Sequence, residues 1–151
     1  MKTKAYLVLS LIMATTVSQV SAATLDSVQA NNIISHVKKS LDAQHSTGCV
    51  AVVDAGGTLL AFQRFDKASP GCVDAAIGKA RTSALYHAPS LKFMQRLQSG
   101  ETTVLAIPHV LALGGGYPLN EQDEVVGAVG VSTPIQTLDN QASEAAAKAF
   151  P

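Results

Sequence analysis

The stretch VAVVDAGGTLLAF (residues 50–62) decides the fold. Val50 to Val53 form an apolar run typical of a buried strand, and residues 54–57 supply a turn, since glycine adopts positive φ without steric cost. A second apolar run, from Leu59 to Phe65, follows at once. Two strands joined by so short a turn pair antiparallel, so the sequence predicts a β-hairpin.

Helical patterns lie on both sides of this hairpin. Thr24 is the expected N-cap of a helix whose apolar residues recur every three or four positions from Leu25 to Leu41. After the hairpin, Pro70-Gly71 introduces a second helix that carries Val73, Ile77, Ala80 and Ala84 on one face and is broken by Pro89. A third, short helix is expected from Ser90, its cap, to about Gln98.

The C-terminal half mixes strands with one more helix. Residues 104–107 and 110–113 are two short apolar runs separated by a proline, and both are expected to be strands. A glycine-rich loop follows, then a last strand over residues 125–131. Thr133-Pro134 is expected to begin a final helix that ends at Ala149. Hairpins with helices grouped between them indicate an α+β sandwich, with helices flanking a central antiparallel sheet.

Composition excludes several classes of function. The chain has 151 residues, 11 Lys and Arg against 11 Asp and Glu, and 47% hydrophobic residues, which fits one globular domain and excludes disorder. Balanced charge without a basic run argues against binding to nucleic acid or to an anionic membrane surface. Because the alanine-rich helices lack a fully polar face, we expect a homo-oligomer.

The N-terminus has the pattern of a secretory signal peptide. Lys2 and Lys4 precede an apolar stretch, residues 5–17, that is too short to span a membrane. Small residues at Val20-Ser21-Ala22 place the expected cleavage before Ala23. The sequence therefore predicts a signal peptide over residues 1–22, a single domain over 23–151 without a membrane span, and a periplasmic or secreted location. The alternative is a short membrane anchor or a buried first helix.

Export affects how the two cysteines are interpreted. In an oxidising compartment Cys49 and Cys72 can form a disulfide. Two buried free thiols are the other interpretation, because the sequence does not show whether the two Cα atoms come close enough.

Few residues indicate chemistry by themselves. P-loop, dinucleotide-binding and nucleophile-elbow motifs are absent from the sequence. Lys79 stands among small residues of the second helix, where it could attract a carboxylate, and the glycines at 114–116 could present backbone N–H groups to a ligand. His87 and His109 fall at the ends of elements and could bind a metal or act as general base. Each has a structural alternative. Lys79 could be solvated, the glycines could form only a tight turn, and the two histidines could be ordinary surface residues. Tyr86, Tyr117 and Met94 are further iron-ligand candidates, with core packing as the alternative.

Several segments together resemble the GlcG/HbpS-type (haem-binding protein-like) family. The hairpin of residues 50–62 is one, and the others are Arg64-Phe65-Asp66, the helix segment 76–84 with Gly78-Lys79-Ala80, the Gly114-Gly115-Gly116-Tyr117-Pro118 loop, the strand 126–132, and Asp139 in the last helix. The motifs occur in order along nearly all of residues 23–151. Two positions differ: Lys67 lies where relatives often have glycine, and His109 where glycine or asparagine is expected.

This resemblance implies a profilin-like α+β sandwich with a sheet of about five antiparallel strands, a homo-oligomer, and haem as the cofactor of exported members. It implies ligand contacts from the second helix and the glycine loop: Lys79, Arg81, Thr82, Gly114, Gly115, Gly116, Tyr117 and Pro118. Lys79 or Arg81 would pair with haem propionates, and His109 or His87 would approach the iron. The expected function is haem binding, for sensing, buffering or redox protection. Two alternatives stay open: a cofactor-independent enzyme acting on an oxygenated small molecule at Lys79, and a contact modulator of another exported protein.

Overall fold

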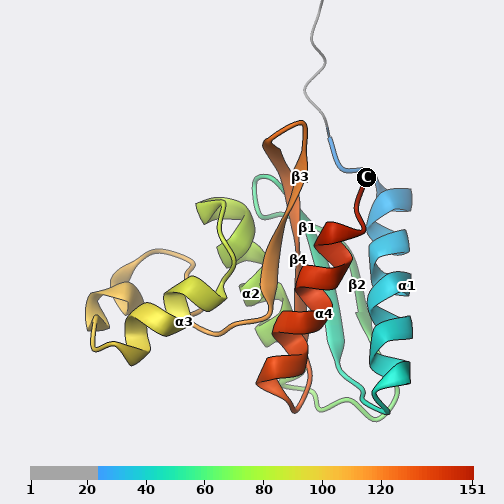
Figure 1. The fold of residues 1–151 in the computed structure, drawn as a ribbon, viewed down its shortest axis with the longest axis horizontal. Helices are drawn as coiled ribbons and strands as arrows, with labels where there is room; N and C mark the ends of the chain where they lie inside the picture. Colours follow the sequence, from blue (N-terminus) through green and yellow to red (C-terminus); the bar gives the residue numbers. More distant parts are fainter. Residues whose placement is uncertain (1–23) are drawn as a thin grey trace, which may run out of the picture.

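The computed structural model describes residues 24–151, so the predicted signal peptide lies outside the described residues. The elements, in chain order, are α1 (Ser27–Ala43), β1 (Cys49–Asp54), β2 (Leu59–Arg64), α2 (Cys72–Tyr86), α3 (Leu91–Gln98), the 3₁₀ helix η1 (Thr102–Ala106), β3 (Gly116–Glu121), β4 (Glu124–Ser132) and α4 (Gln136–Lys148). Helices pack on an antiparallel sheet (Figure 1), which confirms the predicted α+β class.

The sheet has four strands in the order β2-β1-β4-β3, and every neighbouring pair is antiparallel. The predicted hairpin is confirmed, with Cys49 opposite Arg64 and Val52 opposite Ala61. Its turn needs the glycine at Gly57, whose φ is +77°. The long strand β4 lies between β1 and β3 and forms the centre of the sheet with β1.

The strand assignments between residues 104 and 121 were wrong in two ways. Residues 104–107 and 110–113 form η1 and irregular chain, because their apolar side chains bury one another away from the sheet: Val104 packs with Phe93 and Ala112. Conversely, the expected loop at 116–118 begins strand β3. Proline is tolerated there because β3 is an edge strand of the sheet. The described residues therefore contain one strand fewer than expected.

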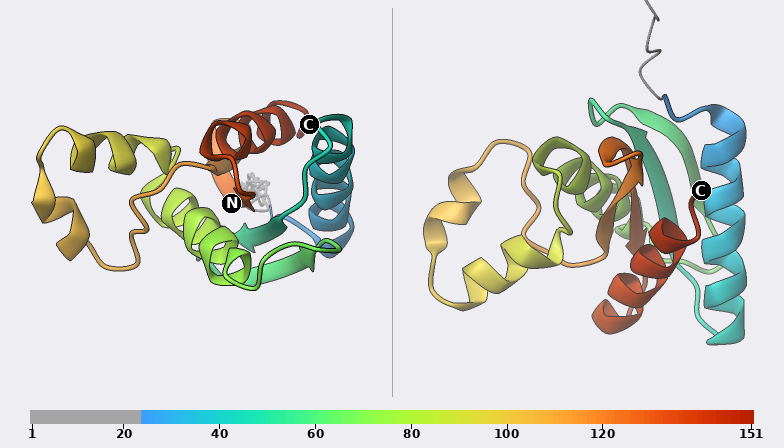
Figure 2. Two further views of the ribbon diagram at one scale, coloured as in Figure 1. Left: turned by 90° about the horizontal axis from the view of Figure 1, so that it is seen from below. Right: turned by 45° about the horizontal axis from the view of Figure 1, so that its top comes forward.

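Helices cover both faces of the sheet (Figure 2). α1 and α4 pack on one face, where Ile33, Val37 and Leu138 join the main core with Val52 and Val129 of the sheet. α2 packs on the opposite face. Burying apolar area on both faces of the sheet stabilises this three-layer arrangement.

α2 lies unusually close to the sheet because two strand residues beneath it are glycines. A Cβ atom placed on Gly130 would come within 2.1 Å of the Ala76 carbonyl oxygen, and one on Gly116 within 2.1 Å of the Lys79 carbonyl oxygen. Side chains at these two positions would push the helix off the sheet. The glycine and alanine content of these segments is therefore a packing requirement.

Three helix starts differ from the sequence expectation. Asp26, and not Thr24, caps α1: its carboxylate accepts a hydrogen bond from the Gln29 backbone N–H at 2.7 Å, and the Gln29 side chain accepts one in return from the Asp26 N–H. Ser90 precedes α3 but gives no side-chain cap, because its Oγ accepts a hydrogen bond from the Gly116 N–H at 2.8 Å. α4 begins at Gln136 rather than beside Pro134.

The predicted disulfide is confirmed. Cys49, the first residue of β1, is bonded to Cys72, the first residue of α2, with the two Cα atoms 5.4 Å apart. The bond ties the N-terminal end of α2 to the sheet. It excludes the alternative of two free thiols.

Residues 87–113 form a lobe that projects away from the sheet and includes α3 and η1 (Figures 1 and 2). The lobe has an apolar cluster of its own, centred on Phe93, Val104 and Ala112. At its base the Tyr86 hydroxyl donates a hydrogen bond to the Pro108 carbonyl at 2.7 Å. This bond fastens the C-terminal part of the lobe to the last turn of α2.

Candidate functional site

Lys79 lies inside the protein and forms an ion pair. Its Nζ is 2.6 Å from Asp139 Oδ2 and donates a second hydrogen bond to the Val131 carbonyl at 3.1 Å, while both charged side chains are only 2% exposed. Asp139 Oδ1 accepts a hydrogen bond from the Thr133 N–H at 2.7 Å. The pair therefore joins α2, the end of β4 and α4, three elements that are far apart in sequence.

Burial and pairing act in opposite directions on Asp139. Loss of solvent raises the pKa of its carboxyl above the ordinary value, and the hydrogen bond and charge of Lys79 offset part of that rise. Because the ammonium group already has two acceptors and almost no solvent contact, it is not available as a free base or as an open anion site. A ligand role for Lys79 remains a prediction that requires this pair to open.

The three glycines beside Lys79 are buried as well. The Gly114 carbonyl accepts a hydrogen bond from the Gln136 side chain at 2.6 Å, and the Gly116 N–H donates one to Ser90 Oγ. Gly115 has a φ of +110°, and a Cβ there would lie 2.7 Å from the Asp139 Cβ. This glycine corner is thus used for close packing between α2, β3 and α4. Ligand binding by these three glycines stays a prediction.

Thr82, a buried residue of α2, contacts the C-terminal end of the lobe. Its Oγ1 accepts a hydrogen bond from the Leu111 N–H at 2.8 Å and donates to the Gly78 carbonyl at 2.8 Å. The Leu111 side chain lies on Gly78, where an added Cβ would be 3.0 Å from Leu111 Cδ2. Residues 109–113 are therefore held along α2 in a defined position.

His87 and His109 lie at the two ends of the lobe, and both are exposed. Both have left-handed backbones, with φ of +48° and +60°. Residues other than glycine rarely adopt this conformation, and histidine and asparagine do so more often than most. The backbone thus explains why glycine or asparagine was expected at position 109. His109, exposed on such a backbone, is a candidate for function.

Apolar and cationic side chains accompany His109 along α2. Ile77, Arg81 and Leu111 are partly buried, and Leu113 is 40% exposed. Arg81 donates a hydrogen bond from Nε to the Gly57 carbonyl at 3.1 Å, which leaves its terminal NH₂ groups free of that bond. We call Ile77, Arg81, His109, Leu111 and Leu113 the α2–lobe surface.

The other predicted iron ligands lie elsewhere. Tyr117 packs against the core on the α1–α4 face, opposite to α2. The Tyr86 hydroxyl donates its hydrogen bond to the Pro108 carbonyl, and Met94 is a partly buried residue of α3. Pro118 is buried in β3. The structure therefore brings Thr82 into contact with His109, while Arg81, the preceding residue of α2, contacts the hairpin turn at Gly57. The Lys79 side chain pairs with Asp139 instead, and Tyr117 lies on the other face of the sheet.

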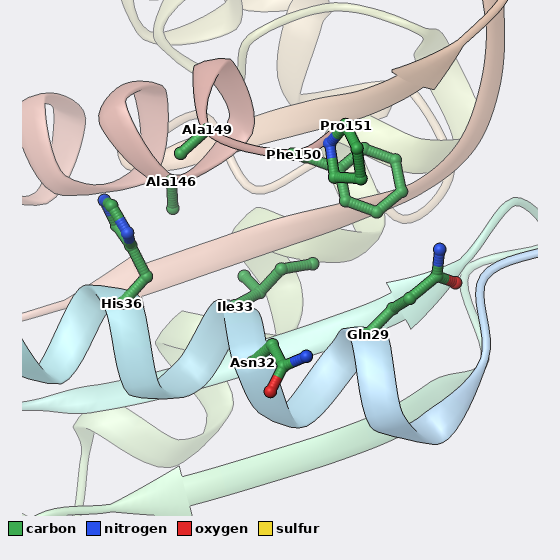
Figure 3. A pocket seen from close by; sticks show the side chains of 8 residues that line it. All are labelled: Gln29, Asn32, Ile33, His36, Ala146, Ala149, Phe150 and Pro151. Carbon is green, nitrogen blue, oxygen red and sulfur yellow. The ribbon is translucent and has the colours of Figure 1, made fainter.

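Sequence reasoning missed a pocket between α1 and α4 (Figure 3). It has a volume of about 230 Å³ and is lined by Gln29, Asn32, Ile33, His36, Ala146, Ala149, Phe150 and Pro151. Gln29, Asn32 and His36 recur at helical spacing on one side of α1, a signal that could have indicated a shared face. A more polar hollow of about 430 Å³ lies where α1 ends beside β2.

Neither a grouped set of metal ligands nor a membrane-spanning helix occurs within residues 24–151. Within that range no three His, Cys, Asp or Glu side chains are grouped as metal ligands. No helix of that range is long and apolar enough to cross a membrane.

Comparison with known proteins identifies the family. Residues 25–148 match the model of a family described as "Haem degrading protein HbpS-like". The chain belongs to the HbpS-like family. It is 33% identical to the protein GlcG of Escherichia coli K12 over 108 residues, which cover 72% of this chain and 81% of GlcG.

Solved structures of similar proteins agree with the fold. HbpS of Streptomyces reticuli, solved as a double mutant, superposes with a TM-score of 0.79 at 28% identity and covers 95% of this chain and 99% of its own. A haem complex of PduOC has a TM-score of 0.75 at 20% identity, with 83% of this chain and 94% of PduOC covered. This second similarity concerns the fold alone.

Proposed function

We propose that this HbpS-like chain is an exported haem-binding protein that binds haem on the α2–lobe surface. Membership of a family described by haem degradation supports haem as the ligand. The observation that carries the location is His109: an exposed imidazole on a left-handed backbone, held against α2 by the contacts of Thr82 with residues 109–111.

The residues of this surface fit haem chemically. Imidazole is a common axial ligand of haem iron, and an arginine is suited to a propionate. Ile77, Leu111 and Leu113 offer apolar contact for a porphyrin face. When bound, haem would supply iron coordination and one-electron chemistry. In this chain His109 would hold the iron and Arg81 a propionate, with His87 as the second imidazole candidate.

The surface is open, and we propose that a second copy of the chain completes it. Pockets that enclose a drug-sized ligand have volumes of about 300–1,000 Å³ and bury most of the ligand. The α1–α4 pocket, at about 230 Å³, is below that range, and the hollow of about 430 Å³ beside β2 is within it but is lined mainly by polar and charged residues. A homo-oligomer that covers Leu113 and the lobe leucine Leu105, which is 62% exposed, would shield both leucines and the haem from water.

The proposed location is the periplasm or the outside of the cell, after cleavage before Ala23. The apolar segment at residues 5–17 and the disulfide between Cys49 and Cys72 support it, because disulfides persist in oxidising compartments. Fractionation of cells that produce the full chain, with N-terminal sequencing of the product, tests this proposal. We expect periplasmic or secreted protein that begins at Ala23, whereas uncleaved protein in the cytoplasm would contradict it.

Haem titration of the mature chain, followed by its Soret absorption, tests the binding proposal. We expect saturable binding that weakens at least tenfold in His109→Ala, while His36→Ala and His45→Ala, at exposed histidines on and just after α1, leave it unchanged. His87→Ala shows whether the second imidazole contributes. Absence of saturation, or equal binding by His87→Ala, His109→Ala and wild type, would contradict the proposal.

A further inference from the structure

The two half-cystines of the disulfide have different surroundings. Cys49 has no exposed surface and belongs to the core between α2 and the sheet. Cys72 is 6% exposed and lines a small pocket of about 160 Å³. The pocket is formed by residues 47–48, 67–69 and 132–134 around Cys72. Of the two half-cystines, Cys72 lines this pocket and Cys49 does not.

A lysine is held beside this pocket at a conformational cost. Lys67 has a φ of +65°, a region that residues with a Cβ rarely adopt. It lines the pocket together with Ser69, Thr133 and Cys72. A glycine would relax the backbone at this position but would remove the ammonium group. The pocket thus combines a disulfide sulfur, hydroxyl groups and one positive charge.

We infer that Cys72 is a site of thiol–disulfide exchange with small thiols that carry a carboxylate. In the exchange, the thiolate of the small molecule attacks Cys72 Sγ and forms a mixed disulfide there. The bond to Cys49 breaks, its electron pair goes to Cys49 Sγ, and Cys49 takes up the proton that the small thiol released. One disulfide is consumed and one is formed, so no further oxidant or reductant is needed.

Access and charge favour attack of the small thiol at Cys72 over attack at Cys49. Attack at Cys49 would require a path through the core, whereas Cys72 is reached through the pocket. Lys67 attracts the carboxylate of the incoming thiol. When a second thiol removes the adduct, Cys72 leaves as a thiolate at the first residue of α2, where the N-terminal N–H groups of a helix favour negative charge. Asp74 in the same turn opposes this effect but is exposed to solvent.

Two small monothiols test the proposal on the folded full chain. 3-Mercaptopropionate carries a carboxylate, and 2-mercaptoethanol is similar in size but neutral. After acid quenching and alkylation, peptide mass spectrometry locates each adduct, while circular dichroism shows that the fold is intact. We expect the adduct on Cys72 at least tenfold more often than on Cys49, and faster reaction with 3-mercaptopropionate. An adduct mainly on Cys49, or none until the chain unfolds, would overturn the proposal.

Variants of Lys67 separate recognition from stability. Lys67→Gly should remove the preference for 3-mercaptopropionate while the melting temperature stays the same or rises, because the backbone is relaxed. Lys67→Arg should keep the preference, and Lys92→Gln, on an exposed residue of α3, should not change it. If Lys67→Gly retains the full preference, carboxylate recognition by Lys67 is wrong.

Discussion

At the scale of single residues, Lys79 and Asp139 form a buried ion pair, whereas the other ion pairs within residues 24–151 are substantially exposed. Taking two charges out of water is expensive, and their attraction offsets the cost only while both partners are present. The pair therefore explains how a lysine can lie in a core of alanines and glycines. It also fixes the position of α4 relative to α2.

Removing one partner should be strongly destabilising. Asp139→Asn leaves the Lys79 ammonium buried without a counter-ion, and we expect a loss of about 3–5 kcal/mol in the free energy of unfolding. Urea unfolding followed by circular dichroism measures it. The matched control is Glu144→Gln, which breaks the exposed pair with Lys148 and should leave the free energy of unfolding nearly unchanged. Equal effects of the two variants would show that burial of the first pair is unimportant.

Thr82 should control the order of residues 109–111 without holding the fold together. Thr82→Val keeps the shape of the side chain but removes the acceptor of the Leu111 N–H, so hydrogen exchange at that amide should accelerate at least tenfold. Thr82→Ser keeps the hydroxyl and should exchange nearly as slowly as wild type. Hydrogen-exchange mass spectrometry or NMR gives the comparison. Unchanged protection in Thr82→Val would mean that this hydrogen bond does not hold the segment.

At the scale of elements, the contact between α2 and the sheet depends on missing side chains. Gly130→Ala would place a Cβ within 2.1 Å of the Ala76 carbonyl, so we expect a loss of more than about 2 kcal/mol, or failure to fold. Gly71→Ala, just before α2, meets nothing within 4 Å and should be neutral or slightly stabilising. Thermal unfolding of both variants checks this. A Gly130→Ala protein as stable as Gly71→Ala would contradict the close packing.

The helices and strands differ in how well the sequence predicts them. The hairpin at residues 50–62 and the helices α1, α2 and α3 follow local patterns of apolar residues, turns and prolines, and these predictions were confirmed apart from their starting residues. Residues 104–107 have a strand-like composition but bury their apolar side chains in the lobe. β3 was missed because its first residues, Gly116 to Pro118, favour turns, and only its edge position in the sheet makes a strand possible.

In the candidate site, too, the sequence identified single residues but not the contacts between distant segments. Lys79 was correctly singled out as a cation among small residues, but its partner is Asp139, 60 residues later. Sequence spacing contains no information on a contact between two helices that pack on opposite faces of a sheet and are 60 residues apart in the chain. His109 was singled out as a histidine at the end of an element, at a position where the family resemblance led us to expect glycine or asparagine, and its positive φ gives the physical reason for that expectation.

At the scale of the whole molecule, the disulfide limits how far the chain can open when it unfolds. It closes a loop of 23 residues in sequence separation. In the chain-entropy model such a loop contributes about 3 kcal/mol to stability. The double variant Cys49→Ala/Cys72→Ala should lose a similar amount in urea unfolding. A loss below about 1 kcal/mol would indicate that the bond constrains the unfolded chain little.

The proposed oligomer is also a property of the whole molecule. Leu105 and Leu113 are exposed leucines of the lobe, and an interface over the lobe would bury them. We expect light scattering to give a mass at least twice that of one mature chain. Leu105→Glu/Leu113→Glu should shift the protein towards the monomer, with Val28→Glu, at an exposed valine of α1, as the control. A wild-type monomer at micromolar concentration would contradict the proposed interface.

The central claim is that ligand binding belongs to the α2–lobe surface and not to the buried corner around Lys79. Two-dimensional NMR of the mature chain, titrated with the diamagnetic analogue zinc protoporphyrin, tests it most directly. We predict that the largest amide shift changes fall at Ile77, Arg81 and residues 109–113, whereas Lys79, residues 114–116 and Asp139 change little. Changes concentrated instead on Gln29, Asn32 and His36 of α1, or saturable binding without any change at residues 109–113, would contradict the claim.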